Sequence, residues 1–472
     1  MEPENPWGPP LDREPQNCAD QRVSGQLTCL RWELNMHSVQ WEVPPACKGF
    51  KPVFRYQGGP MVRGPARTLL SGLTAGVLLI LLGLSLGRSS AAGAPPDRMV
   101  AVGDVHGDFT DLCLILRRTQ LVDEQNHWVG GSATFVQTGD LIDRGTQGRE
   151  SMDLLMALQT EASKAGGNVV PLLGNHEVMN IVGDLRYVTQ PNYAAFADSE
   201  SEKRRKAGYD KYAAWAASHA ESLAAIKQPG VPASEQQWMA EHPAGFLEYR
   251  EAFGPNGKYG KWVRQHAAVA EIGGIIFLHG GISPGLTSMS LDQINKQVRG
   301  EIDNFDKTTE ELVSRKVALP FFTIREIALA VQLELLQQRS ANTAPDTEYH
   351  NRLVRLLDFS NWLCMRDEGP LWFRGYDGWS DEEGGQRISQ ILTAYNATHV
   401  VVAHTVQKSA HIRSRFRGTV FLIDTGMLST YWAGGRASAL EILKGGKIIA
   451  QYLDGQEVLF EKTNAAPSDA PK

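Results

Sequence analysis

The stretch VVPLLGNHEVMN, residues 169–180, decides how the rest of the sequence is interpreted. It begins with an apolar run that is typical of a buried strand and continues, after a glycine, with Asn175, His176 and Glu177. Packing alone does not require three polar side chains at the end of such a strand. Each of them can exchange hydrogen bonds or coordinate a metal, so the stretch is either an ordinary polar turn or part of a site.

The same pattern recurs along the chain, which favours the second interpretation. Apolar runs end in polar clusters at GDVHGD (103–108), GDLIDRG (139–145), GNHE (174–177), HGGIS (279–283) and AHT (403–405). In open α/β sheets the carboxyl ends of strands face the ligand crevice, so residues far apart in sequence converge there. Glycines beside the clusters let the backbone turn sharply and let a substrate come close. The sequence therefore predicts a site built from several strand ends.

The residue types in these clusters are those that bind divalent metals. Asp104 and His106 stand two apart, so on an extended backbone both side chains point the same way and can hold one ion. The remaining ligands are a carboxylate, an amide oxygen and two imidazoles: Asp140, Asn175, His279 and His404. Oxygen and imidazole ligands without a thiolate suit manganese, iron or zinc better than calcium. Six ligands exceed one open tetrahedral site and suit two ions roughly 3.5–4 Å apart, with a carboxylate bridging them.

The segments between the clusters alternate between strand and helix patterns. Apolar runs at 99–104, 133–140 and 168–175 are separated by helical periodicity over 108–120 and 152–167, which is typical of parallel α/β packing. Further strands are expected at 273–283, 392–405, 418–426 and 439–453. Residues 191–270 and 288–360 are rich in charged residues at helical spacing and are predicted to be helical insertions, with Trp215, Trp238 and Trp262 as a small core in the first.

Composition and charge narrow the class of protein. Apolar residues make up 42% of the 472 residues and charged residues 21%, which is typical of a globular protein with a proper core. The net charge is −6, so there is no basic excess to neutralise a phosphate backbone, and no nucleic acid partner is expected. The five cysteines form no CxxC pair, which excludes a zinc knuckle and a disulfide framework as interpretations.

The apolar segment LLSGLTAGVLLILLGLSLG, residues 69–87, indicates a location. Its length lies between that of a signal-peptide core and that of a transmembrane helix. A cleaved signal peptide and an uncleaved membrane anchor therefore remain two alternatives. The arginines that precede it place everything after residue 88 across the membrane, in a periplasm-like or luminal compartment. The expected organisation is a disordered or non-native leader (1–68), the apolar segment (69–87), a linker (88–98), a catalytic domain (99–455) and a disordered tail (456–472).

The motif series resembles that of the phosphoprotein phosphatase family within the metallophosphoesterases. GDVHGD, GDLIDRG, GNHE and HGG carry this resemblance, and GNHEVMNIVGDLRYV (174–188) is similar to the Shewanella-like protein phosphatases in particular. The resemblance implies a calcineurin-like fold, an α/β sandwich of two mixed sheets flanked by helices. It also implies that Asp104, His106 and Asp140 bind a first metal, and that Asp140, Asn175, His279 and His404 bind a second.

The expected reaction is hydrolysis of a phosphomonoester on a protein (Ser/Thr or Tyr) by a hydroxide that bridges the two metals. His176 is the candidate general acid, oriented by Asp143. Arg144 is expected to bind phosphate oxygens together with Asn175. Arg374 is expected to be a second phosphate-binding arginine, in a cleft walled by Trp372, Phe373 and Tyr376. Glu177 is expected to support the loop, whereas His127, His242, His266 and His350 are expected to be solvated.

Two other functions compete with a protein phosphatase. A nucleotide phosphohydrolase of the diadenosine tetraphosphatase type shares the first three motifs, and would require a pocket for a base. A membrane-tethered scaffold without activity would keep the fold, but such relatives lose ligands, and all six are present here. The sequence indicates no particular regulatory subunit.

Overall fold

The computed structural model describes residues 96–461 of the chain, apart from residues 228–230, 232 and 342–345. All of these residues belong to one compact unit. The predicted leader, the apolar segment 69–87 and the chain beyond residue 461 lie outside the described residues. Within the described ranges, no helix is both long enough and apolar enough to cross a membrane.

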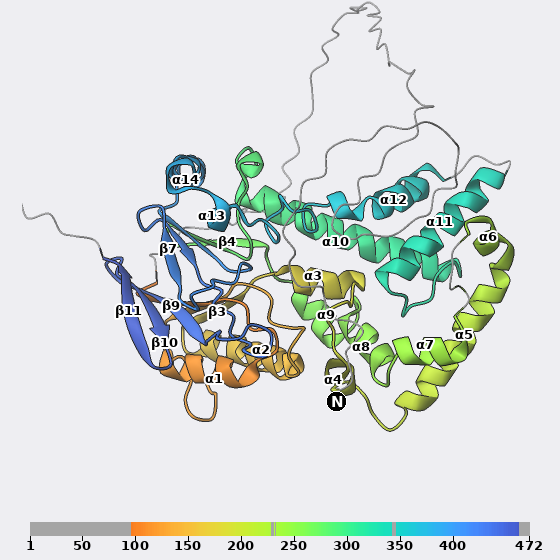
Figure 1. The fold of residues 1–472 in the computed structure, drawn as a ribbon, viewed down its shortest axis with the longest axis horizontal. Helices are drawn as coiled ribbons and strands as arrows, with labels where there is room; N and C mark the ends of the chain where they lie inside the picture. Colours follow the sequence, from red (N-terminus) through yellow and green to blue (C-terminus); the bar gives the residue numbers. More distant parts are fainter. Residues whose placement is uncertain (1–95, 228–230, 232, 342–345, 462–472) are drawn as a thin grey trace, which may run out of the picture. The chain divides into compact units, whose positions relative to one another are not determined.

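Two mixed β-sheets lie at one end of this unit, on the left in Figure 1, and the helical insertions extend from them to the right. The first has six strands in the order β11-β10-β9-β1-β2-β3, and the second has five in the order β4-β5-β6-β8-β7. The strands of the first sheet are β1 (Arg98–Val102), β2 (Thr134–Gln137), β3 (Asn168–Pro171), β9 (Ser438–Leu443), β10 (Ile448–Tyr452) and β11 (Gly455–Phe460). Those of the second are β4 (Val269–Ile272), β5 (Ile275–Leu278), β6 (His399–Val402), β7 (Arg413–Arg415) and β8 (Val420–Leu422).

Each sheet has a parallel part and an antiparallel part. The strands β1, β2 and β3 pair in parallel, and so do β5, β6 and β8. The other pairs, β1–β9, β9–β10, β10–β11, β4–β5 and β7–β8, are antiparallel. The parallel packing predicted for the first three strands is confirmed.

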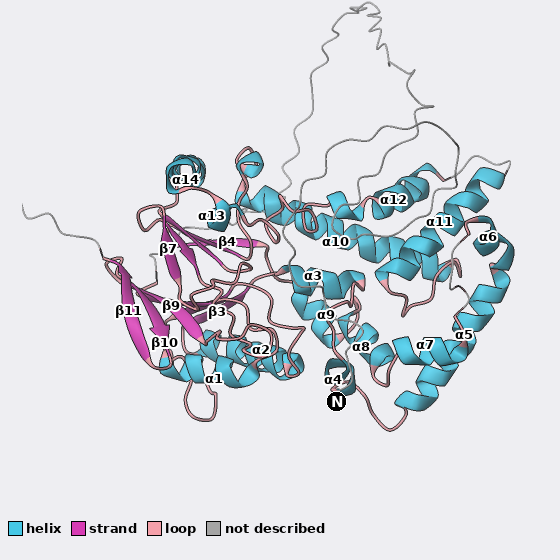
Figure 2. Ribbon diagram, in the orientation of Figure 1, coloured by secondary structure: helices cyan, strands magenta, loops and turns pink. Residues whose placement is uncertain are grey.

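The helices form one set around the sheets and two helical insertions, which Figure 2 shows against the strands. Around the sheets lie α1 (Phe109–Arg118), α2 (Gly148–Lys164), α3 (Asn175–Val182), α13 (Gly375–Gly378) and α14 (Asp381–Tyr395). Between α3 and β4 the chain forms α4 (Gln190–Ala194), α5 (Ser201–Ser218), α6 (Ala220–Ala225), α7 (Glu235–Glu241), α8 (Phe246–Phe253) and α9 (Lys258–Val263). After β5 it forms α10 (Leu291–Ser314), α11 (Ile324–Ser340) and α12 (Thr347–Leu357). The segments 191–270 and 288–360 are therefore helical as predicted, except that the first ends in β4.

Strand side chains alternate between two apolar layers, which shows that the sheets pack face to face. Met99 and Ala101 of β1 lie in one hydrophobic cluster with Phe277 of β5. Val100 and Val102 point to the opposite face and lie in a second cluster with residues of α1 and α2. Successive side chains of a strand point to opposite faces, so both faces of this sheet are buried. The predicted fold class, two mixed sheets in a sandwich flanked by helices, is confirmed.

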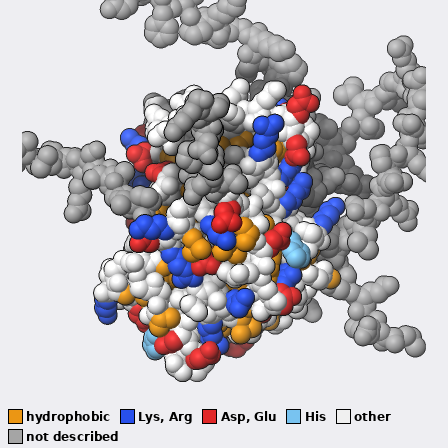
Figure 3. Space-filling view, turned by 90° about the vertical axis from the view of Figure 1, so that its left-hand side faces the viewer, with side chains coloured by type: hydrophobic (Ala, Val, Ile, Leu, Met, Phe, Trp, Pro, Cys, Tyr) orange, Lys and Arg blue, Asp and Glu red, His pale blue; other side chains and the backbone are white. Residues whose placement is uncertain are grey.

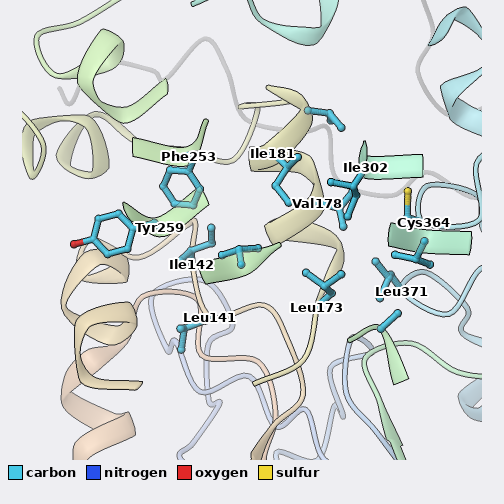
Figure 4. Packing of buried hydrophobic residues seen from close by; sticks show 14 of the residues in the cluster. Leu141, Ile142, Leu173, Val178, Ile181, Phe253, Tyr259, Ile302, Cys364 and Leu371 are labelled. Atoms are coloured by element: carbon cyan, nitrogen blue, oxygen red, sulfur yellow. The ribbon is translucent and has the colours of Figure 1, made fainter. Parts of the chain in front are cut away.

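Helix α3 lies where the two insertions meet the sheets. In Figure 4, Val178 and Ile181 of α3 lie between Phe253 of α8 on one side and Ile302 of α10 on the other. All eight residues of α3 are buried. Because His176 lies in the first turn of this helix, the packing of both insertions against α3 also holds the GNHE residues in place.

The first insertion has an aromatic core, as predicted. Trp215, Trp238 and Trp262 are all buried. The prediction that His242 and His266 are solvated is wrong, because both are buried, with 4% and 8% of their surface exposed. Each stands four residues after a tryptophan, just beyond the end of α7 or α9, and packs against its ring: the ring centroids lie 4.1 Å apart for Trp238 and His242 and 4.4 Å apart for Trp262 and His266.

Three predicted boundaries differ from the structure. The strand expected at 168–175 ends at Pro171, and Asn175 already begins α3. The first part of the strand expected at 392–405 belongs to α14, which continues to Tyr395 and ends before Asn396, whose φ is 52°. The disordered tail expected from residue 456 begins instead with β11, because the chain turns at Leu453 and Asp454 and pairs back onto β10, with Gly455 opposite Tyr452.

The surface beside the strands carries both signs of charge. On the face that Figure 3 shows, lysines and arginines are interspersed with acidic side chains and small apolar patches. A protein that binds a phosphate backbone concentrates basic side chains on its contact face. The face in this view does not have that arrangement.

Candidate functional site

Polar side chains converge at the carboxyl ends of the parallel strands of both sheets. In the first sheet Asp104 and His106 follow β1, Asp140 follows β2, and Asn175 follows β3. In the second sheet the imidazoles of His279 and His404 follow β5 and β6. All six predicted ligands are at most 6% exposed. The sandwich therefore brings the two sets of strand ends to one buried position.

Asp140 lies at the centre of this cluster. Its Oδ2 is 3.2 Å from Nε2 of His279 and 3.8 Å from Nε2 of both His106 and His176. Nε2 of His279 is in turn 2.8 Å from Oδ1 of Asn175 and 3.1 Å from Nδ1 of His404. Oδ2 of Asp104 lies 3.8 Å from Nε2 of His106.

Potential metal ligands form two groups, and within each group the donor atoms lie within 4.8 Å of one another. One group is His106, Asp140 and His176, and the other is Asp140, His279 and His404. Asp140 belongs to both groups, which is the arrangement expected of a carboxylate that bridges two ions.

Backbone carbonyls fix the orientation of two imidazoles. Nδ1 of His106 is 3.0 Å from the carbonyl of Ile142, and Nδ1 of His279 is 3.0 Å from the carbonyl of Thr138. A carbonyl oxygen only accepts hydrogen bonds, so Nδ1 carries the proton in each ring and Nε2 keeps its lone pair. Burial and the nearby His176 also lower the pKa of His106 well below its ordinary value, so this ring stays neutral. Both Nε2 atoms face Asp140 and can bind a metal.

Three buried carboxyl groups share this edge of the sheets. Burial and the charge of Asp424 raise the pKa of Asp104 well above its ordinary value, and burial raises the pKa of Asp424 to about 6. Burial acts the same way on Asp140, but His279 and His176 outweigh it and lower the pKa of Asp140 well below its ordinary value. Among the described residues, no hydrogen-bond donor reaches Oδ2 of Asp424. Crowded carboxylates with unpaired oxygens fit cations, so these residues fit divalent metal ions.

The backbone is strained at the cluster. Five residues other than glycine have a positive φ here: His106 (50°), Asp140 (55°), Asp143 (71°), Arg144 (65°) and His404 (65°). This conformation costs about 1–2 kcal/mol for each residue and concentrates at functional sites in folded proteins.

The backbone between Asp104 and His106 differs from the sequence prediction. Asp104 and His106 were expected to point the same way from an extended backbone. Instead, β1 ends at Val102, and the left-handed turn at His106 brings the two side chains together.

Two glycines let the GDLIDRG and GNHE segments touch. A Cβ atom on Gly174 would lie 2.1 Å from Oδ1 of Asp140, and one on Gly139, whose φ is +96°, would lie 2.4 Å from the amide nitrogen of Gly174. Glu177 then holds the two segments together, because its carboxylate accepts hydrogen bonds from the amides of Asp140 (2.8 Å), Leu141 (2.9 Å) and Gly174 (2.8 Å). Glu177 supports the loop, as predicted.

His176 is paired with Asp143 rather than with a carbonyl. Nδ1 of His176 lies 2.7 Å from Oδ2 of Asp143, and both side chains are at most 2% exposed. Burial lowers the pKa of His176, but the charges of Asp140 and Asp143 outweigh it, and the pKa is raised. A protonated imidazole has no lone pair for a metal. Although Nε2 of His176 lies near Asp140, this ring is therefore suited to donate a proton rather than to ligate.

Arg144 lies between two tyrosine rings beside His176. Its guanidinium carbon is 4.6 Å from the ring centroid of Tyr187 and 3.8 Å from that of Tyr431. Nη2 of Arg144 lies 3.4 Å from Nε2 of His176. Two cationic donors aimed at one place repel each other unless an anion lies between them, so this arrangement is suited to bind a phosphate.

Arg374 lies beside His404. Its Nη1 donates to the carbonyl of His404 (2.8 Å) and to Oγ1 of Thr405 (3.2 Å). Of the aromatic residues expected to wall a cleft beside it, Trp372 lies 5.8 Å from the ring of His404. Phe373 and Tyr376 are instead buried, with 7% and 1% of their surface exposed, and the hydroxyl of Tyr376 donates to a carbonyl in the core. The prediction of a wall made of all three is wrong, because two of them are core residues.

Asp424, Tyr187 and Tyr431 were not predicted as site residues from the sequence. Asp424 follows β8 in the segment IDTG, so it is a sixth polar cluster at the end of a parallel strand, beside the five that were recognised. That signal was present in the sequence. Tyr187 and Tyr431 lie in loops, and no sequence pattern places their rings against Arg144.

Comparison with known proteins agrees with this geometry. Shewanella-like protein phosphatase 2 of Arabidopsis thaliana is 34% identical over 220 residues, which cover 44% of this chain and 53% of the relative. Shewanella-like protein phosphatase 1 of Plasmodium berghei is 26% identical over 333 residues, which cover 70% of this chain and 67% of the relative. The chain thus spans about half the length of the first relative and two thirds of the second. The resemblance to Shewanella-like phosphatases predicted from the motifs is confirmed by both.

A solved structure and a family model complete the comparison. The structure of a cold-active protein-tyrosine phosphatase from a psychrophilic Shewanella species covers 78% of this chain and 81% of its own, with 24% identity and a TM-score of 0.49. Residues 98–408, more than half of the chain, match the model of the calcineurin-like phosphoesterases. The chain therefore belongs to the calcineurin-like phosphoesterase family.

Proposed function

We propose that the protein is a metal-dependent phosphomonoester hydrolase that acts on phosphorylated proteins. The observation that carries this proposal is the convergence of Asp104, His106, Asn175, His279 and His404 around Asp140, with the His176–Asp143 pair beside them. Two relatives with similar sequences are named protein phosphatases, which favours a protein substrate over a nucleotide.

The ligand set supports two divalent ions. Asp104, His106 and Asp140 would hold the first, and Asp140, Asn175, His279 and His404 the second. The described cysteines, Cys113 and Cys364, are buried elsewhere in the core, so neither contributes a thiolate to the site. A ligand set of oxygen and imidazole favours manganese, with iron or zinc as alternatives. When bound, such ions lower the pKa of water and neutralise charge on the phosphoryl oxygens.

The protein's own residues supply binding and proton transfer. Arg144 binds the phosphoryl oxygens and is held by the rings of Tyr187 and Tyr431. Arg374, anchored to the backbone of His404, adds positive charge beside this ligand. His176 carries a proton at Nε2 and gives it to the leaving oxygen, while Asp143 holds Nδ1 and stabilises the charged ring.

Replacing Arg144 with lysine should weaken substrate binding without loss of metal. A lysine keeps the charge but loses the planar fork and the stacking between Tyr187 and Tyr431, so KM for a phosphopeptide should rise and kcat/KM should fall by about 10–100-fold, the value of one or two charge-assisted hydrogen bonds. Steady-state kinetics and metal analysis measure both. Arg186→Lys is the matched control, because Arg186 pairs with Asp184. Equal kinetics for Arg144→Lys and wild type would exclude Arg144 from phosphate binding.

A substrate comparison tests the proposed function. With manganese present, the purified protein should hydrolyse phosphopeptides that carry phosphoserine, phosphothreonine or phosphotyrosine. Hydrolysis of dinucleoside polyphosphates alone would overturn the proposal in favour of a nucleotide phosphohydrolase. Metal-loaded protein without activity on either substrate would favour a scaffold.

The apolar segment 69–87, which lies outside the described residues, supports a further proposal about location. The catalytic domain would lie on the extracytoplasmic side of a membrane, attached through this segment if it is not cleaved. Protease treatment of intact membranes should then leave a tag at the C-terminus of the full chain protected from the cytoplasmic side. Digestion of the tag from that side would contradict the proposal.

A further inference from the structure

Asn180, in α3, connects the His176–Asp143 pair to the first insertion. Its Nδ2 donates to both carboxylate oxygens of Asp143, each 3.0 Å away, and to the carbonyl of His176 at 2.9 Å. Its Oδ1 accepts a hydrogen bond of 2.6 Å from the hydroxyl of Tyr249 in α8. Asn180, Asp143, His176 and Tyr249 are all at most 3% exposed. A continuous, buried hydrogen-bond chain therefore runs from the insertion to the ring of His176.

The hydroxyl of Tyr249 decides which way the amide of Asn180 faces. Rotation of an asparagine amide about its last bond exchanges the donor and the acceptor with little change of shape. In the rotated form Oδ1 of Asn180 would face the carboxylate of Asp143, and both groups accept hydrogen bonds. Burial and the charge of Asp143 raise the pKa of Tyr249 well above its ordinary value, so its hydroxyl remains a neutral donor that binds Oδ1. Tyr249 thus keeps Nδ2 on Asp143.

The residue after Tyr249 holds the same part of α3 by its backbone. Nη1 of Arg250 donates to the carbonyl of Asn180 (3.0 Å), and Nη2 donates to the carbonyl of Phe322 (3.3 Å). Arg250 is buried, and a Cβ atom on Gly183 would lie 2.9 Å from its Nη2, so the guanidinium closely fits the end of α3. Helix α8 therefore contacts Asn180 at both its side chain and its carbonyl.

We propose that Tyr249 is a positioning residue for the proton donor of the active site. By fixing the amide of Asn180 it keeps Asp143 aligned with Nδ1 of His176, and so keeps Nε2 of His176 directed at the leaving oxygen. No bond forms or breaks at Tyr249, and the proton that reaches the leaving group comes from His176. This inference rests on the proposed phosphomonoesterase function, and it gives the first insertion a direct role in the reaction.

Tyr249→Phe tests this role because it removes the hydroxyl and keeps the ring, which packs 5.0 Å from the ring of Phe196. Two aryl esters report on proton donation: phenolate from phenyl phosphate needs a proton as it leaves, whereas the more acidic para-nitrophenol needs it much less. We expect kcat for phenyl phosphate to fall by about tenfold, the upper value for one neutral hydrogen bond, and kcat for para-nitrophenyl phosphate to fall by less than about twofold. KM and metal content should not change.

Tyr259→Phe is the matched control. Its ring also packs against Phe196, with the ring centroids 5.6 Å apart, but its hydroxyl donates to Asp153 of α2 at 3.0 Å instead of to Asn180. This variant should treat both esters as wild type does. A double-mutant cycle adds a second readout: if Tyr249 acts through Asn180, Tyr249→Phe should cause no further loss in an Asn180→Ala background.

The outcomes separate this inference from the proposed function. Equal losses on the two esters in Tyr249→Phe, or additive losses in the double variant, would overturn the positioning role while the function stands. Wild-type protein without activity on either ester would overturn both. If Tyr249→Phe does not fold, Asn180→Ala alone decides: a loss larger for phenyl phosphate, with metal content intact, supports the chain, and equal losses overturn it.

Discussion

Replacing His176 with asparagine is expected to lower kcat for phenyl phosphate by about 10²–10⁴-fold, the usual contribution of a general acid, and to leave the bound metal near the wild-type amount. The reason is the difference between His176 and the other imidazoles of the site. His106 and His279 donate Nδ1 to carbonyls and keep Nε2 free, whereas Nδ1 of His176 binds the carboxylate of Asp143 at 2.7 Å. This pairing favours a proton on both nitrogens of His176.

Kinetics and elemental analysis of the same preparation measure this prediction. The matched control is His127→Asn, because the side chain of His127 is 68% exposed and pairs with Glu161 at 3.1 Å. It should keep both activity and metal. If His176→Asn lost metal in proportion to activity, His176 would be a ligand, as its distance of 3.8 Å from Oδ2 of Asp140 would then suggest. Unchanged activity would exclude it as the acid.

Asp140→Asn is expected to have the opposite pattern, with loss of metal and of activity together. Asp140 is the residue that the two groups of potential ligands share, and an asparagine of the same shape lacks the charge that holds two cations. Activity should fall by at least about 10³-fold, because metal ions supply several kcal/mol of transition-state stabilisation and each 1.4 kcal/mol is about tenfold in rate.

The control for this variant is Asp153→Asn on α2, an exposed carboxylate whose partner is Lys258. It should bind metal and turn over substrate as wild type does. Circular dichroism on Asp140→Asn distinguishes lost ligation from lost folding, since α3 and the sheets should remain. A variant that kept its full metal content would contradict the assignment of Asp140 as the shared ligand.

Much of the site could be predicted from sequence because its residues follow one local rule. Asp104, Asp140, Asn175, His279 and His404 each follow a short apolar run, all but His404 beside a glycine, and parallel strands bring such positions together. The same rule covers Asp424, whose segment IDTG was assigned to a strand but not recognised as a strand end. No donor among the described residues reaches the buried Oδ2 of Asp424, which leaves this oxygen available to a cation.

Other parts of the site depend on contacts that no local pattern contains. Tyr249 binds Asn180 across 69 residues of sequence, and this contact exists because α8 packs against α3. Likewise, Tyr431 reaches Arg144 only through the fold, and the positive φ of His106 replaces the extended geometry that spacing alone suggested. Burial was also mispredicted from the sequence: His242 was expected to be solvated, but its ring stacks on Trp238.

The central claim is that six side chains from two sheets hold two divalent ions that serve phosphoester hydrolysis. Its most direct test is metal analysis of the purified full-length chain, before and after chelation, with phosphatase activity measured on the same samples. We predict two divalent ions per chain, parallel loss of metal and activity on chelation, and recovery of both when manganese is added back. Full activity in chelated protein, or a metal-loaded protein with no more than one ion per chain, would contradict the claim.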